Sequence, residues 1–277
     1  MPELPEVETM RRGVLPIVGA KITAVDKVRC PRKPILFSPR CDAFRRRTVG
    51  QTVTAVDRVG KRVAVRLGSD DTIIFEPRMT GLVLCGESPD PLYLRVRIDL
   101  TGGDADRLWY WDRRGLGNVR LLSPAEFAAA YGPDKLGPDG LVVSSADLRR
   151  RLGTSRRAVK VALLDQTVVA GIGNIYAAEI LHVAGVHPAA RCDRLSKPKW
   201  QRIADATHVV LEEAIRHEGS SLGDGTYRNA LNKDGSYQNE HRVYGRDGQA
   251  CPRCGAKVRK TVQTQRSTFF CAGCQRR

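Results

Sequence analysis

The sequence of 277 residues lacks any run of about 18 apolar residues, the length that a membrane-spanning helix requires. Its N-terminus has neither the basic region nor the apolar region of a secretory signal, so we expect a cytoplasmic protein. Internal repeats and low-complexity segments are also missing. These absences indicate a globular protein, and the length allows two domains.

Acidic residues are scarce relative to basic ones. The 46 Lys and Arg residues exceed the 30 Asp and Glu residues and give a formal net charge of +16. Such an excess favours a polyanionic partner, because a basic surface releases counterions from a phosphate backbone. The basic residues form small clusters such as 45–47 and 149–151, without a basic amphipathic helix. Nucleic acid is therefore favoured over an anionic membrane surface.

The hydrophobic pattern divides the chain into a β-rich half and a helical half, an α+β class. A helix is predicted from Glu6 to about Val18, followed by short segments rich in Val, Ile and Thr up to Leu122, without intervening helices. This pattern is typical of a β-sandwich or barrel. A linker rich in Gly and Pro, 132–145, leads to helices, one ending near Gln166 and another N-capped by Asn174 after the turn GIG.

Four of the eight cysteines form two pairs near the C-terminus. Their pattern, CxxC-x16-CxxC, is that of a zinc ribbon with four Cys ligands, Cys251, Cys254, Cys271 and Cys274. Four protein ligands leave no open coordination position, so we expect one structural Zn²⁺. The segment 251–277 contains no acidic residue, which favours contacts with phosphate.

Several motifs occur together in one known family. PELPEVET at the N-terminus, GIGNIYAAE, HRVYGRDG and the terminal cysteine pairs follow one another in an order that closely resembles formamidopyrimidine-DNA glycosylase. The resemblance implies an N-terminal helix with a two-layer β-sandwich, then a helix–two-turns–helix domain with a zinc finger. It implies these ranges: catalytic domain 1–131, linker 132–145, DNA-binding domain with a lesion-capping loop 146–240, and zinc finger 241–277.

The resemblance also implies a reaction. Once Met1 is removed, the secondary amine of Pro2 attacks C1′ of a nucleoside that carries an oxidised purine, such as 8-oxoguanine or a formamidopyrimidine. Glu3 serves as general acid and base, and β- and δ-elimination then cut the strand. Lys61 contacts the phosphate beside the lesion and assists elimination, and Arg266 completes the catalytic set.

The resemblance implies a monomeric enzyme that acts on duplex DNA in the bacterial cytoplasm, at the nucleoid. It also implies a further set of residues that bind this DNA. The gap left by the flipped base is filled by three of them, Met79, Arg114 and Leu116, of which Leu116 replaces the family's Phe. The others are Lys160, Asn174, Tyr244 and Arg266, of which Asn174 and Arg266 bind phosphates flanking the lesion. The stretch 220–240 corresponds to the loop that covers the flipped base, which favours purine lesions.

Two alternatives stay open at the level of sequence. Leu116 is compatible with an endonuclease VIII-like glycosylase for oxidised pyrimidines, although PELPEVET and the capping loop argue against it. A non-catalytic DNA-binding zinc-finger protein would have lost Pro2, Glu3 or Lys61, and all three are present.

Overall fold

The computed structural model describes residues 2–221, 227 and 233–276. The chain divides into two compact units, Met1–Gly132 with His217–Ser236 and Pro133–Arg216 with Tyr237–Arg277. Among the described residues, no helix has both the length and the apolar character to cross a membrane.

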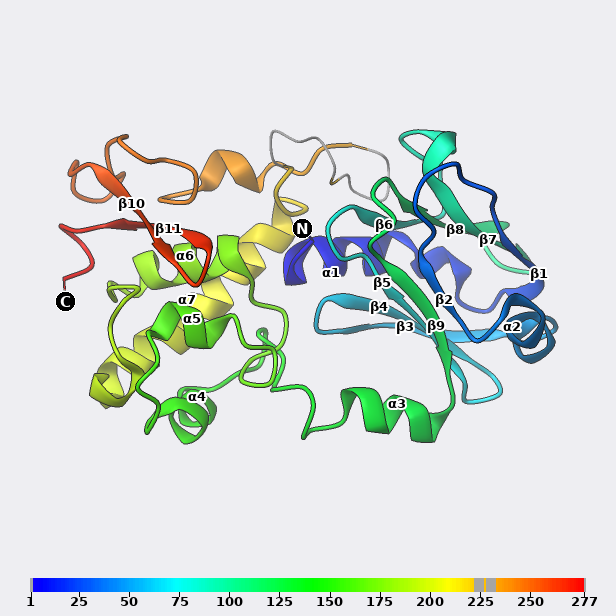
Figure 1. Cartoon of the computed structure of the whole chain (residues 1–277), viewed down its shortest axis with the longest axis horizontal. Helices are drawn as coiled ribbons and strands as arrows, with labels where there is room; N and C mark the ends of the chain where they lie inside the picture. The colour runs from blue at the N-terminus through cyan, green and yellow to red at the C-terminus, as the bar shows by residue number, and fades with distance from the viewer. Residues whose placement is uncertain (1, 222–226, 228–232, 277) are drawn as a thin grey trace. The chain divides into compact units, whose positions relative to one another are not determined.

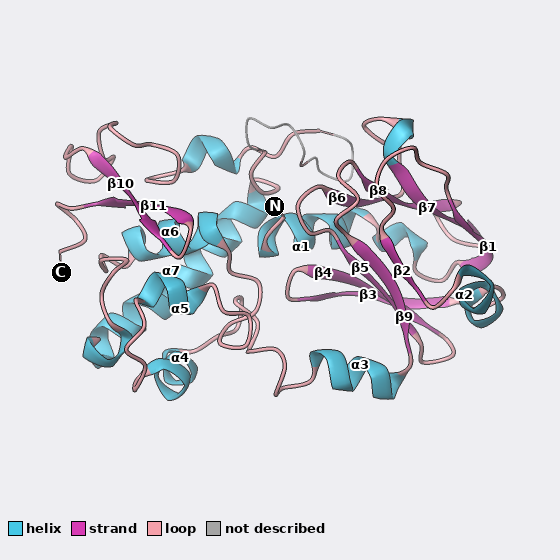
Figure 2. Cartoon of the chain, viewed as in Figure 1, coloured by secondary structure: helices cyan, strands magenta, loops and turns pink. Residues whose placement is uncertain are grey.

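The first unit contains two sheets (Figures 1 and 2). One sheet has the order β1-β7-β8-β6 and is antiparallel throughout. The other has the order β2-β9-β5-β4-β3, in which only the β2–β9 pair is parallel. The strand bounds are β1 Lys21–Lys27, β2 Leu36–Ser38, β3 Val53–Val59, β4 Arg62–Leu67, β5 Thr72–Glu76, β6 Gly81–Leu84, β7 Leu94–Thr101, β8 Arg107–Asp112 and β9 Asn118–Leu122.

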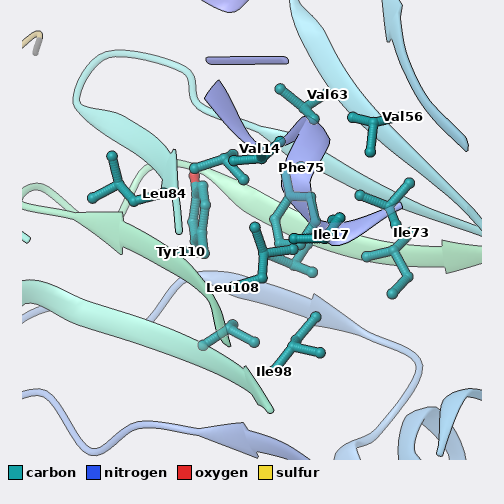
Figure 3. Packing of buried hydrophobic residues seen from close by; sticks show 14 of the residues in the cluster. Val14, Ile17, Val56, Val63, Ile73, Phe75, Leu84, Ile98, Leu108 and Tyr110 are labelled. Carbon is teal, nitrogen blue, oxygen red and sulfur yellow. The ribbon is translucent and has the colours of Figure 1, made fainter. Parts of the chain in front are cut away.

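The core of this unit is formed by apolar residues from helical segments and from both sheets. Helix α1 spans Leu4–Gly13 and is followed by a 3-10 turn, η1, at Leu15–Ile17, so the helix starts two residues before the predicted Glu6 and ends earlier than Val18. Figure 3 shows Val14 and Ile17 beside core residues of the strands, including Phe75 and Tyr110. The alternating apolar residues of the strands supply this core, which confirms the predicted β-sandwich.

The expectation of strands without an intervening helix was wrong. Helix α2, Cys41–Thr48, lies between β2 and β3, and its buried residues are Phe44 and Thr48. Its eight residues include four charged side chains and only one large apolar residue, so the sequence offers little apolar surface to mark a helix. Helix α3, Pro124–Tyr131, is capped by Ser123 through a capping box with Glu126, as its sequence indicates. A short 3-10 turn, η2, lies at Pro91–Tyr93.

The second unit contains helices and one hairpin. The helices are α4 Ser145–Leu152, α5 Val159–Leu163, α6 Asn174–Val183 and α7 Lys197–Arg216, with 3-10 turns η3 at Cys192–Arg194 and η4 at Tyr237–Glu240. The hairpin pairs β10 Val258–Gln263 with β11 Arg266–Cys271. The helix predicted to end near Gln166 is α5, which already ends at Leu163. Gln166 lies in the following turn, where its side-chain amide donates to the carbonyls of Leu164 and Ile172.

The predicted linker, 132–145, is anchored to the second unit. Gly137 donates its N–H to the Gln166 carbonyl, and Gly140 donates to that of Ala170. The unit boundary after Gly132 falls at the start of the predicted linker. His217–Ser236, predicted as part of 146–240, groups with the first unit. The ranges of functional domains stay a prediction.

Candidate functional site

The N-terminal turn is held by Glu6. Pro2 and Glu3 are buried, and Glu3 is the N-cap residue of α1. One oxygen of the Glu6 carboxylate accepts the N–H of Glu3 at 2.8 Å, and the other accepts the N–H of Ser220 at 2.8 Å. One buried carboxylate thus fixes both the turn that carries Pro2 and the first residues of the predicted capping loop.

The two described segments that flank the loop, 219–221 and 233–236, approach each other closely at glycine residues. Gly219 has φ +81°, and a Cβ there would lie 2.7 Å from a Glu6 oxygen. A Cβ on Gly235 would lie 2.4 Å from the Gly219 carbonyl oxygen. The Gly235 N–H also donates to Ser221 Oγ. Only glycine permits this close approach; residues 222–226 and 228–232 of the predicted capping loop lie outside the described residues.

Lys61 occupies the two-residue turn between β3 and β4, beside Gly60 with φ +58°. Arg58 donates to the Gly60 carbonyl and to the Glu8 carboxylate, which is buried on α1. Burial opposes ionisation of Glu8, but hydrogen bonds and charges from Arg11, Arg12 and Arg58 hold its pKa below the ordinary value of 4.5. The turn that bears Lys61 is therefore tied to the helix that directly follows Pro2 and Glu3.

The three predicted gap-filling residues lie on two loops joined by one buried carboxylate. Oδ1 of Asp112 accepts the Thr80 hydroxyl and the N–H of Arg114, and Oδ2 accepts the N–H of Gly117 at 2.8 Å. Asp112 is fully buried, whereas Met79 and Leu116 are each 37% exposed. This network projects apolar side chains from a rigid base, the arrangement that a wedge between base steps requires.

The loop with Leu116 has its own backbone requirement. Gly115 has φ +63°, and a Cβ there would lie 2.1 Å from the Lys33 carbonyl oxygen. The close approach to Lys33 and the positive φ therefore require glycine beside Leu116.

A polar cluster lies at the start of α6. The expectation that Asn174 is the N-cap was wrong: the N-cap is Gly173, and Asn174 is the first helical residue. Its Oδ1 accepts the Lys160 ammonium at 2.7 Å, and its Nδ2 donates to the Ser267 carbonyl at 3.1 Å. Lys160, 1% exposed, also donates to the Ser267 carbonyl and the Thr268 hydroxyl. Lys160 therefore holds Asn174 and β11 together in this structure, and a direct contact with DNA stays a prediction.

Arg266 is exposed at the start of β11, next to Ser267. The hairpin turn before it places Thr264 at φ 45° and Gln265 at φ 61°, a left-handed conformation that β-branched residues rarely adopt. The cluster of Lys160, Asn174 and Ser267 thus fixes the hairpin strand on which Arg266 stands. Two predicted phosphate-binding residues, Asn174 and Arg266, come from segments that these bonds join.

Tyr244 has a well-defined structural environment. Its backbone N–H donates to Glu179 Oε1 at 2.8 Å, and its ring packs edge-on against His241 and Phe269. The carboxylate of Glu179, fully buried, also accepts the N–H groups of Arg242 and Val243. Burial raises the pKa of Glu179 despite these bonds. These contacts support a structural role for Tyr244, and its DNA contact stays a prediction.

The four predicted zinc ligands gather in one place. The sulfur atoms of Cys251, Cys254, Cys271 and Cys274 all lie within 4.8 Å of one another. Tetrahedral Zn–S bonds of about 2.3 Å require sulfur separations of about 3.8 Å. The Cys251–Cys274 separation is 3.8 Å and the Cys254–Cys271 separation 3.4 Å. The donor set and its spacing fit one structural zinc ion.

The sequence analysis missed three residues whose hydrogen bonds hold the candidate site residues in place: Thr80, Asp112 and Glu179. It also did not predict that Lys160 is buried. Glu179 lies in the NIYAAE segment and Asp112 precedes the Arg-Arg pair, so both stood next to residues that were identified. Nothing in the local sequence indicates that these two carboxylates are buried, because acidic residues are usually exposed.

Three family models match this chain. One, described as Formamidopyrimidine-DNA glycosylase N-terminal domain, matches residues 1–119. The Formamidopyrimidine-DNA glycosylase H2TH domain matches residues 136–225. The zinc finger found in FPG and IleRS matches residues 248–277. Together they account for most of the chain.

Relatives and solved structures of similar proteins agree with these matches. A formamidopyrimidine-DNA glycosylase of Geobacillus kaustophilus is 37% identical, with 100% of both chains covered. That of Latilactobacillus sakei is 36% identical over 99% of this chain and 98% of the relative. A Lactococcus lactis mutant glycosylase, in complex with DNA that contains Fapy-dG, has a TM-score of 0.87 and 32% identity, and covers 100% of both chains. The Lactococcus lactis protein with abasic-site DNA has a TM-score of 0.86 and 31% identity, covering 99% of this chain and 100% of that one.

Proposed function

Since this chain belongs to the formamidopyrimidine-DNA glycosylase family, we propose that it excises oxidised purines from duplex DNA and then cleaves the strand at the abasic site. The related structures hold DNA with Fapy-dG or an abasic site, the substrate and the intermediate of such a reaction. The net charge of +16 supports duplex DNA as the partner. We place the enzyme, acting as a monomer, in the bacterial cytoplasm at the nucleoid.

The observation that carries the catalytic proposal is the Glu6 carboxylate, which positions the turn containing Pro2 and Glu3. Pro2 precedes the N-terminus of α1, where the helix dipole disfavours a protonated amine. After removal of Met1, the neutral secondary amine attacks C1′ and the C–N glycosidic electrons leave with the base. Glu3, buried beside it, supplies and accepts the protons.

The covalent product explains the strand cleavage that we propose. Once the sugar opens, the iminium at C1′ acts as an electron sink and makes the C2′ proton acidic, so the 3′ phosphate leaves. A second elimination releases the 5′ phosphate. In this proposal Lys61, on the turn that Arg58 bonds through the Gly60 carbonyl, contacts the phosphate beside the lesion and assists this elimination.

Binding residues divide into two groups in this proposal. Asn174 and Arg266, together with the basic finger that zinc holds in shape, bind phosphates. Met79, Arg114 and Leu116 fill the gap that the flipped base leaves, which offsets part of the unstacking cost of a few kcal/mol. Arg266→Ala should weaken binding to undamaged duplex and reduce its salt dependence by about one contact.

The decisive experiment traps the intermediate. The enzyme is incubated with borohydride and a duplex that carries one 8-oxoguanine opposite cytosine, and mass spectrometry locates the adduct. We expect it on Pro2, with slower trapping in Pro2→Gly, which keeps an amine, and loss of base excision in Glu3→Gln. Glu87→Gln, an exposed position, is the matched control and should retain full activity.

Two results would overturn this assignment: an adduct on Lys61, or excision by the wild-type protein without any trappable adduct. A parallel duplex with an oxidised pyrimidine tests the lesion class. Faster excision of that base would favour the endonuclease VIII-like alternative, and retention of Met1 should abolish trapping because it converts the amine into an amide. Wild-type binding without excision of either base would favour the non-catalytic alternative.

A further inference from the structure

The last turn of α6 brings a histidine to the zinc cysteines. His182 is fully buried, and its Nε2 atom lies 3.3 Å from Sγ of Cys251. Cys251 is itself only 2% exposed. Neither side chain is part of the proposed catalytic or DNA-contacting groups, so their contact requires a separate explanation.

The charge of the sulfur decides which atom donates. A zinc-bound cysteine is a thiolate, and a thiolate excluded from water is stabilised by a hydrogen-bond donor. With its proton on Nε2, the imidazole supplies such a donor. With its proton on Nδ1 only, it would direct a lone pair at the lone pairs of the sulfur.

The other side of the imidazole ring favours the same arrangement. Nδ1 is buried and has no hydrogen-bond partner in the described part of the chain. His182 lines a cavity of about 370 Å³ together with Arg242, Arg246 and Arg253. Their positive charge attracts the lone pair of Nδ1 and repels an N–H dipole at that position. The cavity and the sulfur therefore orient the ring in the same sense.

We propose that His182 carries its proton on Nε2 and donates a hydrogen bond to the zinc-bound thiolate of Cys251, as a positioning residue of the metal site. Groups outside the ligand set commonly orient metal ligands in this way and raise the affinity for the metal. Helix α6 would then support two parts of the finger segment, Ser267 through Asn174 at its start and Cys251 through His182 in its last turn.

Other bonds keep the finger attached when His182 is replaced. Arg253 donates to the Val183 carbonyl, and Gln275 donates to the Val186 carbonyl at 3.0 Å. A His182 variant should therefore fold with zinc present. The proposal concerns zinc only, so it stands or falls independently of the glycosylase reaction.

The test measures zinc affinity of the full-length protein by competition with a chromophoric chelator. His182→Phe should raise the zinc dissociation constant by about 10- to 100-fold. His182→Gln, whose amide can donate, should recover part of the loss. The matched control is His208→Phe, because His208 lies in the same unit and its Nε2 contacts the Val143 carbonyl, away from the cysteines. It should leave the zinc affinity unchanged.

A second measurement on the wild-type protein covers the case in which His182→Phe fails to fold. Long-range ¹H–¹⁵N correlation spectra identify the protonated ring nitrogen directly, and ¹¹³Cd substitution should show coupling through the N–H···S bond. A proton on Nδ1 alone would overturn the proposal. So would a folded His182→Phe variant with wild-type zinc affinity.

Discussion

Asp112 offers a test of how the loops of Met79 and Leu116 are held. Asp112→Asn preserves the shape of the side chain but replaces one acceptor oxygen with an NH₂ donor. If the amide oxygen faces Thr80 and Arg114, the NH₂ group faces the N–H of Gly117, which then loses its acceptor. In the opposite orientation the NH₂ group faces the N–H of Arg114, which keeps the Thr80 hydroxyl as an acceptor, but the Thr80 O–H loses the oxygen that accepts it. Neither rotamer therefore satisfies every donor of the site.

The size of the effect follows from these contacts. A hydrogen bond to a charged acceptor contributes about 1.5–3 kcal/mol, and a buried N–H without an acceptor costs about 1–3 kcal/mol. Since these terms overlap, we expect Asp112→Asn to lower the free energy of unfolding by about 2–4 kcal/mol. Loss of a fixed wedge should also cost about 1–2 kcal/mol in binding to lesion DNA, about 5- to 30-fold in affinity.

Two assays separate the consequences. Urea unfolding gives the stability, and titration with lesion-containing and undamaged duplexes gives the affinities. Binding to undamaged duplex should change little, because phosphate contacts dominate there. Asp104→Asn, an exposed position, is the control. An Asp112→Asn protein with wild-type stability and wild-type lesion affinity would refute the reasoning.

Four further changes have clear expected outcomes. Leu116→Phe should be tolerated and should strengthen lesion binding in duplex titrations, because a flat ring stacks on bases; loss of 8-oxoguanine excision would show that the loop is aligned wrongly. Cys254→Ser should lose zinc and DNA binding together, and normal DNA cleavage by metal-free protein would contradict this. Thr264→Asn should raise stability in urea by about 1 kcal/mol, because Asn tolerates its left-handed backbone; a loss of stability would argue against strain there. Because the pKa of Glu8 is lowered in the folded state, its carboxylate contributes its full stability above pH 4.5 and loses it as the pH falls through the folded-state pKa. The unfolding free energies of wild type and Glu8→Gln should therefore converge when they are measured at decreasing pH. A difference that stays constant with pH would exclude this linkage.

Much of the site could be identified from the sequence because its chemistry is local. The zinc ligands follow from two CxxC pairs, since each pair places two thiolates in one turn. The motifs around Pro2 and Asn174 identified the family, which the comparisons then confirmed.

Other features followed only from tertiary contacts. Helix α2 has only one large apolar residue, Phe44, whose role is evident only from its packing in the core. The N-cap of α6 is Gly173 and not the predicted Asn174, whose side chain instead bonds Lys160 and Ser267. Ser267 is distant from Asn174 in the sequence.

The sequence by itself determined the division into a β-rich part and a helical part, the zinc ligands and the identity of the family, because those depend on residue types at short spacing. The tertiary structure alone decided that Asp112, Glu179 and Lys160 are buried and which atoms they hold, and that His182 reaches Cys251. The physical reason is that a charged or polar side chain is buried only where distant backbone and side-chain groups converge to satisfy it, and no local pattern records that convergence.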